Sequence, residues 1–150
     1  MTIIGIFAGE HRWLSNFWPA QVEIDRFICP TVEHAYQAAK VDGGPESPVF
    51  RQIVRARTPG EAKRLARTVP FILRHDWATA RIDVMSDLIA QKFRPGTPIA
   101  DRLLATGDAE LREGNHWNDR FWGVDIRTGA GLNWLGRILM NQRDDLAGRI

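Results

Sequence analysis

An acid, an amide and an amine follow one another along one side of a predicted helix. Glu33, Gln37 and Lys40 lie within about 60° of one another at 100° per residue, where they flank the apolar residues of the helix. A carboxylate can carry a proton or stabilise an oxocarbenium-like sugar cation, and a desolvated lysine can attack a sugar carbon. The alternative interpretation is a solvated Glu–Lys pair on the helix surface.

A second group of polar residues lies between residues 113 and 123, interleaved with large aromatic side chains. Three large aromatics, two Asn, two acids and two Gly occur within these eleven residues, a composition that is unusual for a regular helix or strand. Loops of this kind often carry functional sites. Asp119 is the second candidate carboxylate. The alternative is a packed turn that Trp side chains anchor.

Aromatic rings are the third ingredient, because the chain has six Trp and one Tyr. Ser15 and Asn16 lie between aromatic neighbours in the segment 13–19, and Trp77 follows Arg74 at a predicted helix start. Indole rings can stack on a nucleobase or fill a core. These groups together favour a ribose- or nucleotide-type ligand.

Composition limits the alternatives. The 150 residues carry a net charge of +2, but eight bases against two acids between Arg51 and Arg81 give that segment +6. Such a surplus suits a phosphate-bearing ligand or a nucleic acid, or forms a solvated helix face. A single cysteine, Cys29, excludes an intramolecular disulfide and a multi-cysteine metal site. With no apolar run of membrane-spanning length, we expect a cytoplasmic protein without a membrane partner.

Several known cofactor- and metal-binding motifs are incomplete in this sequence. Gly129 and Gly131 begin a dinucleotide fingerprint, but Trp134 stands at the third glycine. The four His show no paired metal-ligand spacing. We therefore expect no cofactor and no metal. Cys29 could be a nucleophile, although a lone Cys beside a strand is more typical of buried packing.

Periodicity and capping signals predict one α+β domain over residues 1–150, mostly helical with a small antiparallel sheet. Strands are expected at 3–7, 22–27 and 109–111. Helices are expected after Thr31, after Thr58-Pro59 with a capping box to Glu61, after Asp76, after Thr97-Pro98 and after Gly131.

The same segments resemble the NADAR (YbiA-like) family over nearly the whole chain and in the same order. The resemblance rests on 13–17, 30–40, 58–63, 74–77, 104–111, 113–119, 122–123 and 131–140. It implies the YbiA-like fold. Three positions differ from the usual pattern: Asn118 and Ala66 stand where glycine is common, and Trp18 replaces a frequent Tyr.

The resemblance implies an N-glycosidase that hydrolyses a ribose C1′–N bond. The substrate it implies first is a ribosylamino-pyrimidine phosphate intermediate of riboflavin biosynthesis; the alternative is ADP-ribosyl-guanine in nucleic acid. By this resemblance Glu33, Trp77 and Asp119 match the functional Glu, Trp and Asp of the family, and Lys40 matches its helix lysine. Predicted substrate-binding residues are Ser15, Asn16, Phe17, Arg67, Arg74, Asn115, Trp122, Gly123, Asn133 and Arg137.

In the resulting hypothesis Trp77 stacks on the departing base, while Asp119 and Glu33 face the ribose. Lys40 either fixes the ribose or forms a transient Schiff base with the opened sugar. The six Trp divide into Trp77 and Trp122 for the ligand, Trp13 and Trp117 for the pocket wall, and Trp18 and Trp134 for packing. Two rival functions are a non-catalytic module that binds ADP-ribose or NAD, and an interaction domain whose Trp residues form its core.

Overall fold

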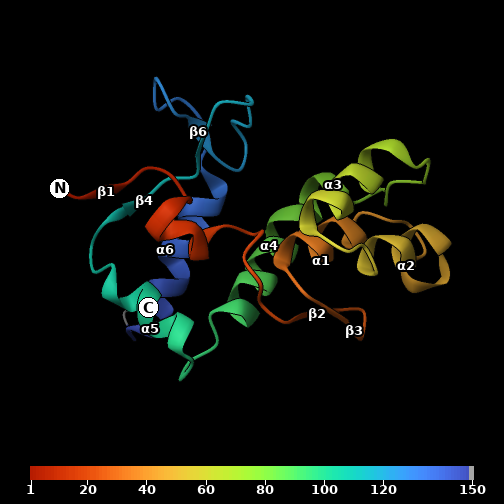
Figure 1. Cartoon of the computed structure of the whole chain (residues 1–150), viewed down its shortest axis with the longest axis horizontal. Coiled ribbons are helices and arrows are strands. Elements are labelled where there is room, and N and C mark those ends of the chain that lie inside the picture. The colour runs from red at the N-terminus through yellow and green to blue at the C-terminus, as the bar shows by residue number, and fades with distance from the viewer. Residues whose placement is uncertain (149–150) are drawn as a thin grey trace. The chain divides into compact units, whose positions relative to one another are not determined.

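The computed structural model describes residues 1–148 as six α-helices, two 3-10 helices and six short strands (Figure 1). In chain order these are β1 (Ile3–Ile4), η1 (Gly9–Leu14), β2 (Val22–Ile24), β3 (Phe27–Cys29), α1 (Val32–Ala39), η2 (Gly44–Glu46), α2 (Pro48–Val54), α3 (Pro59–Thr68), α4 (Trp77–Lys92), α5 (Pro98–Ala105), β4 (Glu110–Leu111), β5 (Gly114–Asn115), β6 (Val124–Asp125) and α6 (Trp134–Leu146). The α+β class predicted from the sequence is confirmed.

The described strands form three separate pairs rather than one sheet. The hairpin β2–β3 is antiparallel, as expected, and Asp25 and Arg26 in its two-residue turn both have positive φ, which matches the twist of the flanking strands. The other two pairs, β1–β4 and β5–β6, are parallel. The expectation of one small antiparallel sheet therefore holds for β2–β3 alone among the described strands.

Contacts within the chain define two compact units. The first joins residues 1–15 to the residues from Phe93 onward, and the second is the continuous segment Asn16–Lys92. These units are defined by contacts alone, so the single domain expected over residues 1–150 stays a prediction.

The continuous unit is built around α1, which contacts α2, α3, α4 and β2 (Figure 1). Every residue of α1 is buried, including its polar ones. Phe50 and Ile53 of α2 and Leu88 and Ile89 of α4 are fully buried. An eight-residue helix has little stability of its own, so packing on all sides fixes its position.

The discontinuous unit pairs β1 with β4 and packs α5 and α6 together. Leu14, Phe93 and Leu139 are fully buried in it, and Trp13 meets Phe93 edge to face at 6.2 Å. Trp13 is thus a core residue, with 4% of its surface exposed.

Capping explains several helix starts. The hydroxyls of Thr31, Thr58 and Thr97 each accept a hydrogen bond from the backbone N–H three residues later. The Glu61 carboxylate accepts from the N–H of Arg57 rather than that of Thr58, so the predicted capping box is displaced by one residue. Asp76 precedes α4, but both of its carboxylate oxygens accept from Arg74.

Candidate active site

Glu33 is a buried carboxylate in the first turn of α1. Its side chain and backbone together are 9% exposed. The helix begins there because Thr31 caps it, and the Glu33 N–H donates to the backbone carbonyl of Asn16 at 3.1 Å. An acid near a helix N-terminus is favoured by the helix dipole. The sequence and its packing thus hold an acid where water is largely excluded.

Gln37 lies one helical turn after Glu33 and contacts its carboxylate. The Nε2 of Gln37 donates to Oε2 of Glu33 at 2.5 Å. Gln37 is 6% exposed, and its Oε1 has no hydrogen-bond partner within residues 1–148. A buried polar atom without a partner is uncommon and costs free energy.

Lys40 completes the row at the end of α1. Burial lowers the pKa of its ammonium; Glu33 opposes that shift, whereas the positive charges of Lys63 and Arg81 add to it. The Lys40 Nζ lies 5.2 Å from the centre of the Tyr36 ring. A lysine whose pKa is lowered has more of the neutral amine that nucleophilic attack requires.

Trp77 belongs to the same unit and is connected to Lys40 through Tyr36. The Tyr36 and Trp77 ring centres are 5.2 Å apart at an angle of 52°. Arg74 lies over Trp77 at 6.0 Å while its guanidinium binds Asp76 through two hydrogen bonds. Trp77 is only 7% exposed, so a base would meet a small part of this ring.

Asp119 lies in the other unit, in a loop that is held by hydrogen bonds to the Asp119 backbone and side chain. Asn115, which is 1% exposed, accepts from the Asp119 N–H and donates to the Asp119 carbonyl. The Asp119 Oδ1 accepts from the N–H groups of Phe121 and Trp122, at 3.2 and 2.9 Å. The loop is therefore ordered by these hydrogen bonds, which also fix the Asp119 side chain.

The neighbouring residues of this loop explain one departure from the family pattern. Asn118 has φ +69°, a left-handed conformation that glycine adopts readily and asparagine tolerates. Gly123 packs so tightly that an added Cβ would lie 2.0 Å from the Glu113 carbonyl oxygen. Trp122 is half-buried and meets Phe121 edge to face, whereas Trp117 is 57% exposed.

Asn133 serves the backbone of its own unit. Its side chain donates to the Leu111 carbonyl and accepts from the Glu113 N–H, so it joins the start of α6 to β4 and the residues after it. This use of both amide groups supports a structural role. Its predicted substrate contact stays a prediction.

The remaining predicted ligand residues differ in exposure. Arg67 and Arg137 are exposed, and Arg137 lies over the Trp134 ring at 5.1 Å. Phe17 is 41% exposed. Ser15 follows η1, and its N–H bonds to the Arg12 carbonyl. Asn16 has a buried Oδ1 with no partner among the described residues.

The structure therefore gathers the predicted residues into two groups. Glu33, Lys40, Trp77, Arg74 and Asn16 belong to the unit 16–92, and Asn115, Asp119, Trp122, Gly123 and Asn133 belong to the other. The sequence placed Gln37 in the row with Glu33 and Lys40 but gave it no role, and it did not point to Lys63 or Arg81. The helical spacing already placed Gln37 beside Glu33, but Lys63 and Arg81 come from α3 and α4, and no spacing rule connects them with Lys40.

Cys29 is not a candidate nucleophile in this structure. Its side chain is fully buried, and burial raises the pKa of its thiol to about 11. Reactive cysteines are partly exposed and have lowered pKa values. The packing interpretation of Cys29 is the one that its environment supports.

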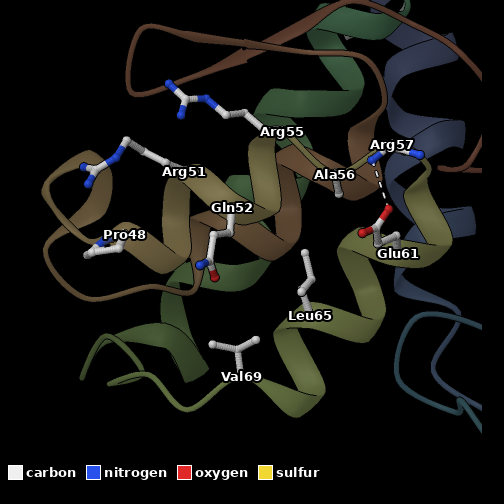
Figure 2. A pocket seen from close by; sticks show the side chains of 9 residues that line it. All are labelled: Pro48, Arg51, Gln52, Arg55, Ala56, Arg57, Glu61, Leu65 and Val69. Carbon is white, nitrogen blue, oxygen red and sulfur yellow. Dashed lines mark hydrogen bonds between the residues drawn. The ribbon is translucent and has the colours of Figure 1, made fainter.

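A hollow of about 670 Å³ opens between α2 and α3 (Figure 2). Its lining consists of Pro48, Arg51, Gln52, Arg55, Ala56, Arg57, Glu61, Leu65 and Val69. None of the predicted site residues is among these nine, and Arg51 is already bound to the Pro45 carbonyl. Within residues 1–148 there is no cluster of three metal-ligating side chains and no helix able to cross a membrane.

Fold and geometry define a small α+β protein in which one helix carries a buried acid and a buried amide and ends at a half-buried lysine. The NADAR domain model matches residues 6–147. The chain belongs to the NADAR domain family.

Relatives agree with this assignment. A riboflavin biosynthesis protein of Vibrio vulnificus is 42% identical over 91% of the chain, which spans only 36% of that protein. An N-glycosidase of Nostoc punctiforme is 39% identical, with 88% of this chain and 83% of that protein covered. The NMR structure of Escherichia coli YbiA matches with a TM-score of 0.83 at 32% identity, covering 97% of this chain and 85% of that one.

Proposed function

We propose that this protein is an N-glycosidase that hydrolyses the C1′–N bond of a ribosylamino-pyrimidine phosphate. The observation that carries the proposal is Glu33, a residue that is 9% exposed and whose carboxylate accepts a hydrogen bond from Gln37. The names of its relatives, N-glycosidase and riboflavin biosynthesis protein, support the same reaction and the same substrate class.

The chemistry follows from these groups. As the C1′–N bond breaks, its electron pair leaves with the base nitrogen and positive charge develops at C1′. Water adds to C1′ and gives up a proton, and the departing nitrogen gains one. A buried carboxylate stabilises such a cation more strongly than an exposed one, because fewer water molecules screen it. In this proposal Glu33 and Asp119 divide the tasks of charge stabilisation and proton transfer.

Basic residues and aromatic rings supply binding. Lys63 and Arg81 add positive charge near Lys40, which itself interacts with Glu33, and a phosphorylated substrate requires such positive charge. Trp77 is the candidate contact for the departing base. An ADP-ribose-binding module without catalysis would gain nothing from a buried carboxylate, because phosphates are anions.

The proposal is tested by turnover of a ribosylamino-pyrimidine phosphate and of ADP-ribosyl-guanine. Glu33→Gln and Asp119→Asn should each lower kcat by about 10²-fold or more, since each removes a charge that acts in the transition state. Chromatographic detection of the free base measures the rate. Gln52→Met, at an exposed position of α2, is the control and should keep the parent rate.

Two results would contradict the proposal. Parent-like rates in both carboxylate variants would remove their catalytic roles. Tight binding of ADP-ribose by the parent protein without any product would favour the binding module. Turnover of ADP-ribosyl-guanine alone would keep the N-glycosidase but replace its substrate.

A further inference from the structure

Only one of the two polar atoms of the Gln37 side-chain amide has a hydrogen-bond partner among residues 1–148. Its Nε2 donates to the Glu33 carboxylate at 2.5 Å, and its Oε1 is buried without a partner among residues 1–148. With 6% of Gln37 exposed, bulk water is a poor substitute for that partner. Buried acceptors that lack a protein donor are candidates for a ligand donor.

The orientation of this amide is fixed by chemistry. An ionised carboxylate offers only acceptors, so the amide nitrogen has to face Glu33. The oxygen then has to point away from the Glu33 carboxylate. Gln37 therefore presents its Oε1 as an acceptor next to the Glu33 carboxylate. The amide cannot turn its Oε1 toward Glu33 without losing the hydrogen bond between Nε2 and that carboxylate.

A second buried acceptor lies at the beginning of the same helix. The Asn16 Oδ1 has no described partner, and the Asn16 backbone carbonyl accepts from the Glu33 N–H. The Asn16 Nδ2 lies 3.6 Å from the Met85 sulfur, which is a weak acceptor. Two unsatisfied amide oxygens, one on a residue bonded to the Glu33 carboxylate and one on a residue bonded to the Glu33 backbone, suit a ligand that has several hydroxyl donors.

We propose that Gln37 is both a positioning residue and a substrate-binding residue: its Nε2 holds the Glu33 carboxylate, and its Oε1 accepts a hydrogen bond from the ribose 2′-hydroxyl. This inference rests on the proposed function, because Glu33 has to face C1′. The 2′-hydroxyl is the sugar donor adjacent to C1′, so a residue bonded to Glu33 is placed to receive it.

The first test is a two-by-two comparison of enzyme and substrate. The parent protein and Gln37→Met, which has similar volume and no amide, are assayed on the ribosylamino-pyrimidine phosphate and on its 2′-deoxy analogue. The parent should lose about tenfold or more in kcat/KM on the deoxy analogue, since its buried acceptor stays unpaired. Gln37→Met should discriminate much less. Gln52→Met is the matched control and should behave as the parent does.

Gln37→Glu separates the two tasks of the side chain. It keeps an acceptor for the 2′-hydroxyl but places a second carboxyl group against Glu33. Two buried carboxyl groups in contact cannot both ionise, so this variant should retain the 2′-discrimination while kcat falls. The acidic limb of the pH–rate profile should move upward in Gln37→Met, because the Glu33 carboxylate loses a hydrogen bond that favours its charged form. A residue that only fills space would leave this limb unchanged.

A binding measurement keeps the inference independent of turnover. Calorimetry compares ribose 5-phosphate with 2-deoxyribose 5-phosphate in the parent and in Gln37→Met. Equal discrimination in both proteins would overturn the 2′-hydroxyl contact, and an unmoved acidic limb would overturn the positioning role. Absence of turnover in the parent would instead contradict the proposed function, while the calorimetric comparison would still decide the contact. Thermal melting shows that each variant is folded.

Discussion

At the residue scale, Lys40 combines burial with a mixed electrostatic environment. Burial and the charges of Lys63 and Arg81 lower its pKa, and Glu33 alone among the named causes raises it. The balance increases the share of neutral amine at a given pH. That property distinguishes a lysine poised for covalent chemistry from one that only binds phosphate.

We expect borohydride added during turnover to trap a sugar adduct on Lys40. Reduction of the Schiff base should give a stable mass increase, which peptide mass spectrometry locates. Lys40→Arg keeps the positive charge but cannot form the imine, so it should show no adduct. A parent protein that turns over without any adduct would leave Lys40 the role of fixing the ribose.

Lys92, at the end of α4, is a buried lysine. It is 4% exposed, and burial lowers its pKa from 10.5 to about 7. Between these pH values the unfolded chain holds more protons than the folded protein. The free energy of unfolding should therefore rise with pH from about 7 to 10.5. This gain is lost as the pH falls from 10.5 to about 7, and below about 7 Lys92 adds no further pH dependence.

Lys92→Met removes the cost of burying this charge. We expect it to raise the free energy of unfolding by about 2–4 kcal/mol at pH 6 and to flatten the slope above pH 7. Urea titrations across pH measure both. Arg94→Met changes an exposed base two residues away and should do neither. A Lys92→Met protein less stable than the parent at pH 6 would contradict this account.

At the element scale, helix starts were predictable wherever Thr-Pro marked them. The Thr58-Pro59 and Thr97-Pro98 starts correspond to α3 and α5. Helix α2 was missed, although Ser47-Pro48 and the spacing of Phe50, Ile53 and Val54 signal it. It comes shortly after the residues Gly43, Gly44 and Pro45, which interrupt the helical pattern.

The parallel pairs were less accessible to sequence reasoning. A strand of two residues, such as β5 or β6, is too short to show an alternating pattern. Its partner is set by tertiary packing and close approach rather than by its own residues. The segment 22–27 was predicted as one strand or hairpin arm, but the turn at Asp25 and Arg26 divides it, and the second arm, β3, was not predicted.

The tight packing of the Gly123 backbone against Glu113 can be tested by substitution. We expect Gly123→Ala to lower the free energy of unfolding by about 1–3 kcal/mol, since its Cβ would meet the Glu113 carbonyl oxygen. Gly5→Ala is the control, because its Cβ would make only an ordinary contact of 3.9 Å with Ile3. Chemical denaturation compares the two. Equal stability of the two variants would mean that the loop can move aside.

At the scale of the whole molecule, only those residues of the candidate site that lie close together in the sequence could be predicted to be neighbours. Glu33, Gln37 and Lys40 share one helix, so their proximity follows from helical geometry. The link from Lys40 to Lys63 and Arg81 depends on how three helices pack, which spacing alone does not encode. Likewise, the resemblance selected Trp77, but its packing against Tyr36 came from the structure.

The two compact units should respond separately to truncation. Removing residues 1–15 takes away β1, which pairs with β4, and Trp13, which packs on Phe93. We expect amide hydrogen exchange to accelerate in residues 93–148 and to change little in 16–92. Trp13→Leu should give a weaker form of the same pattern. Uniform acceleration along the chain would show that the units unfold together.

The pairing of β1 with β4 also bears on synthesis. Ile3 and Ile4 leave the ribosome early, but their partners Glu110 and Leu111 emerge only after the intervening segment has been made. The nascent chain can therefore complete residues 16–92 while its first strand still waits for a partner. Folding during translation would thus complete the unit 16–92 before β1 pairs with β4.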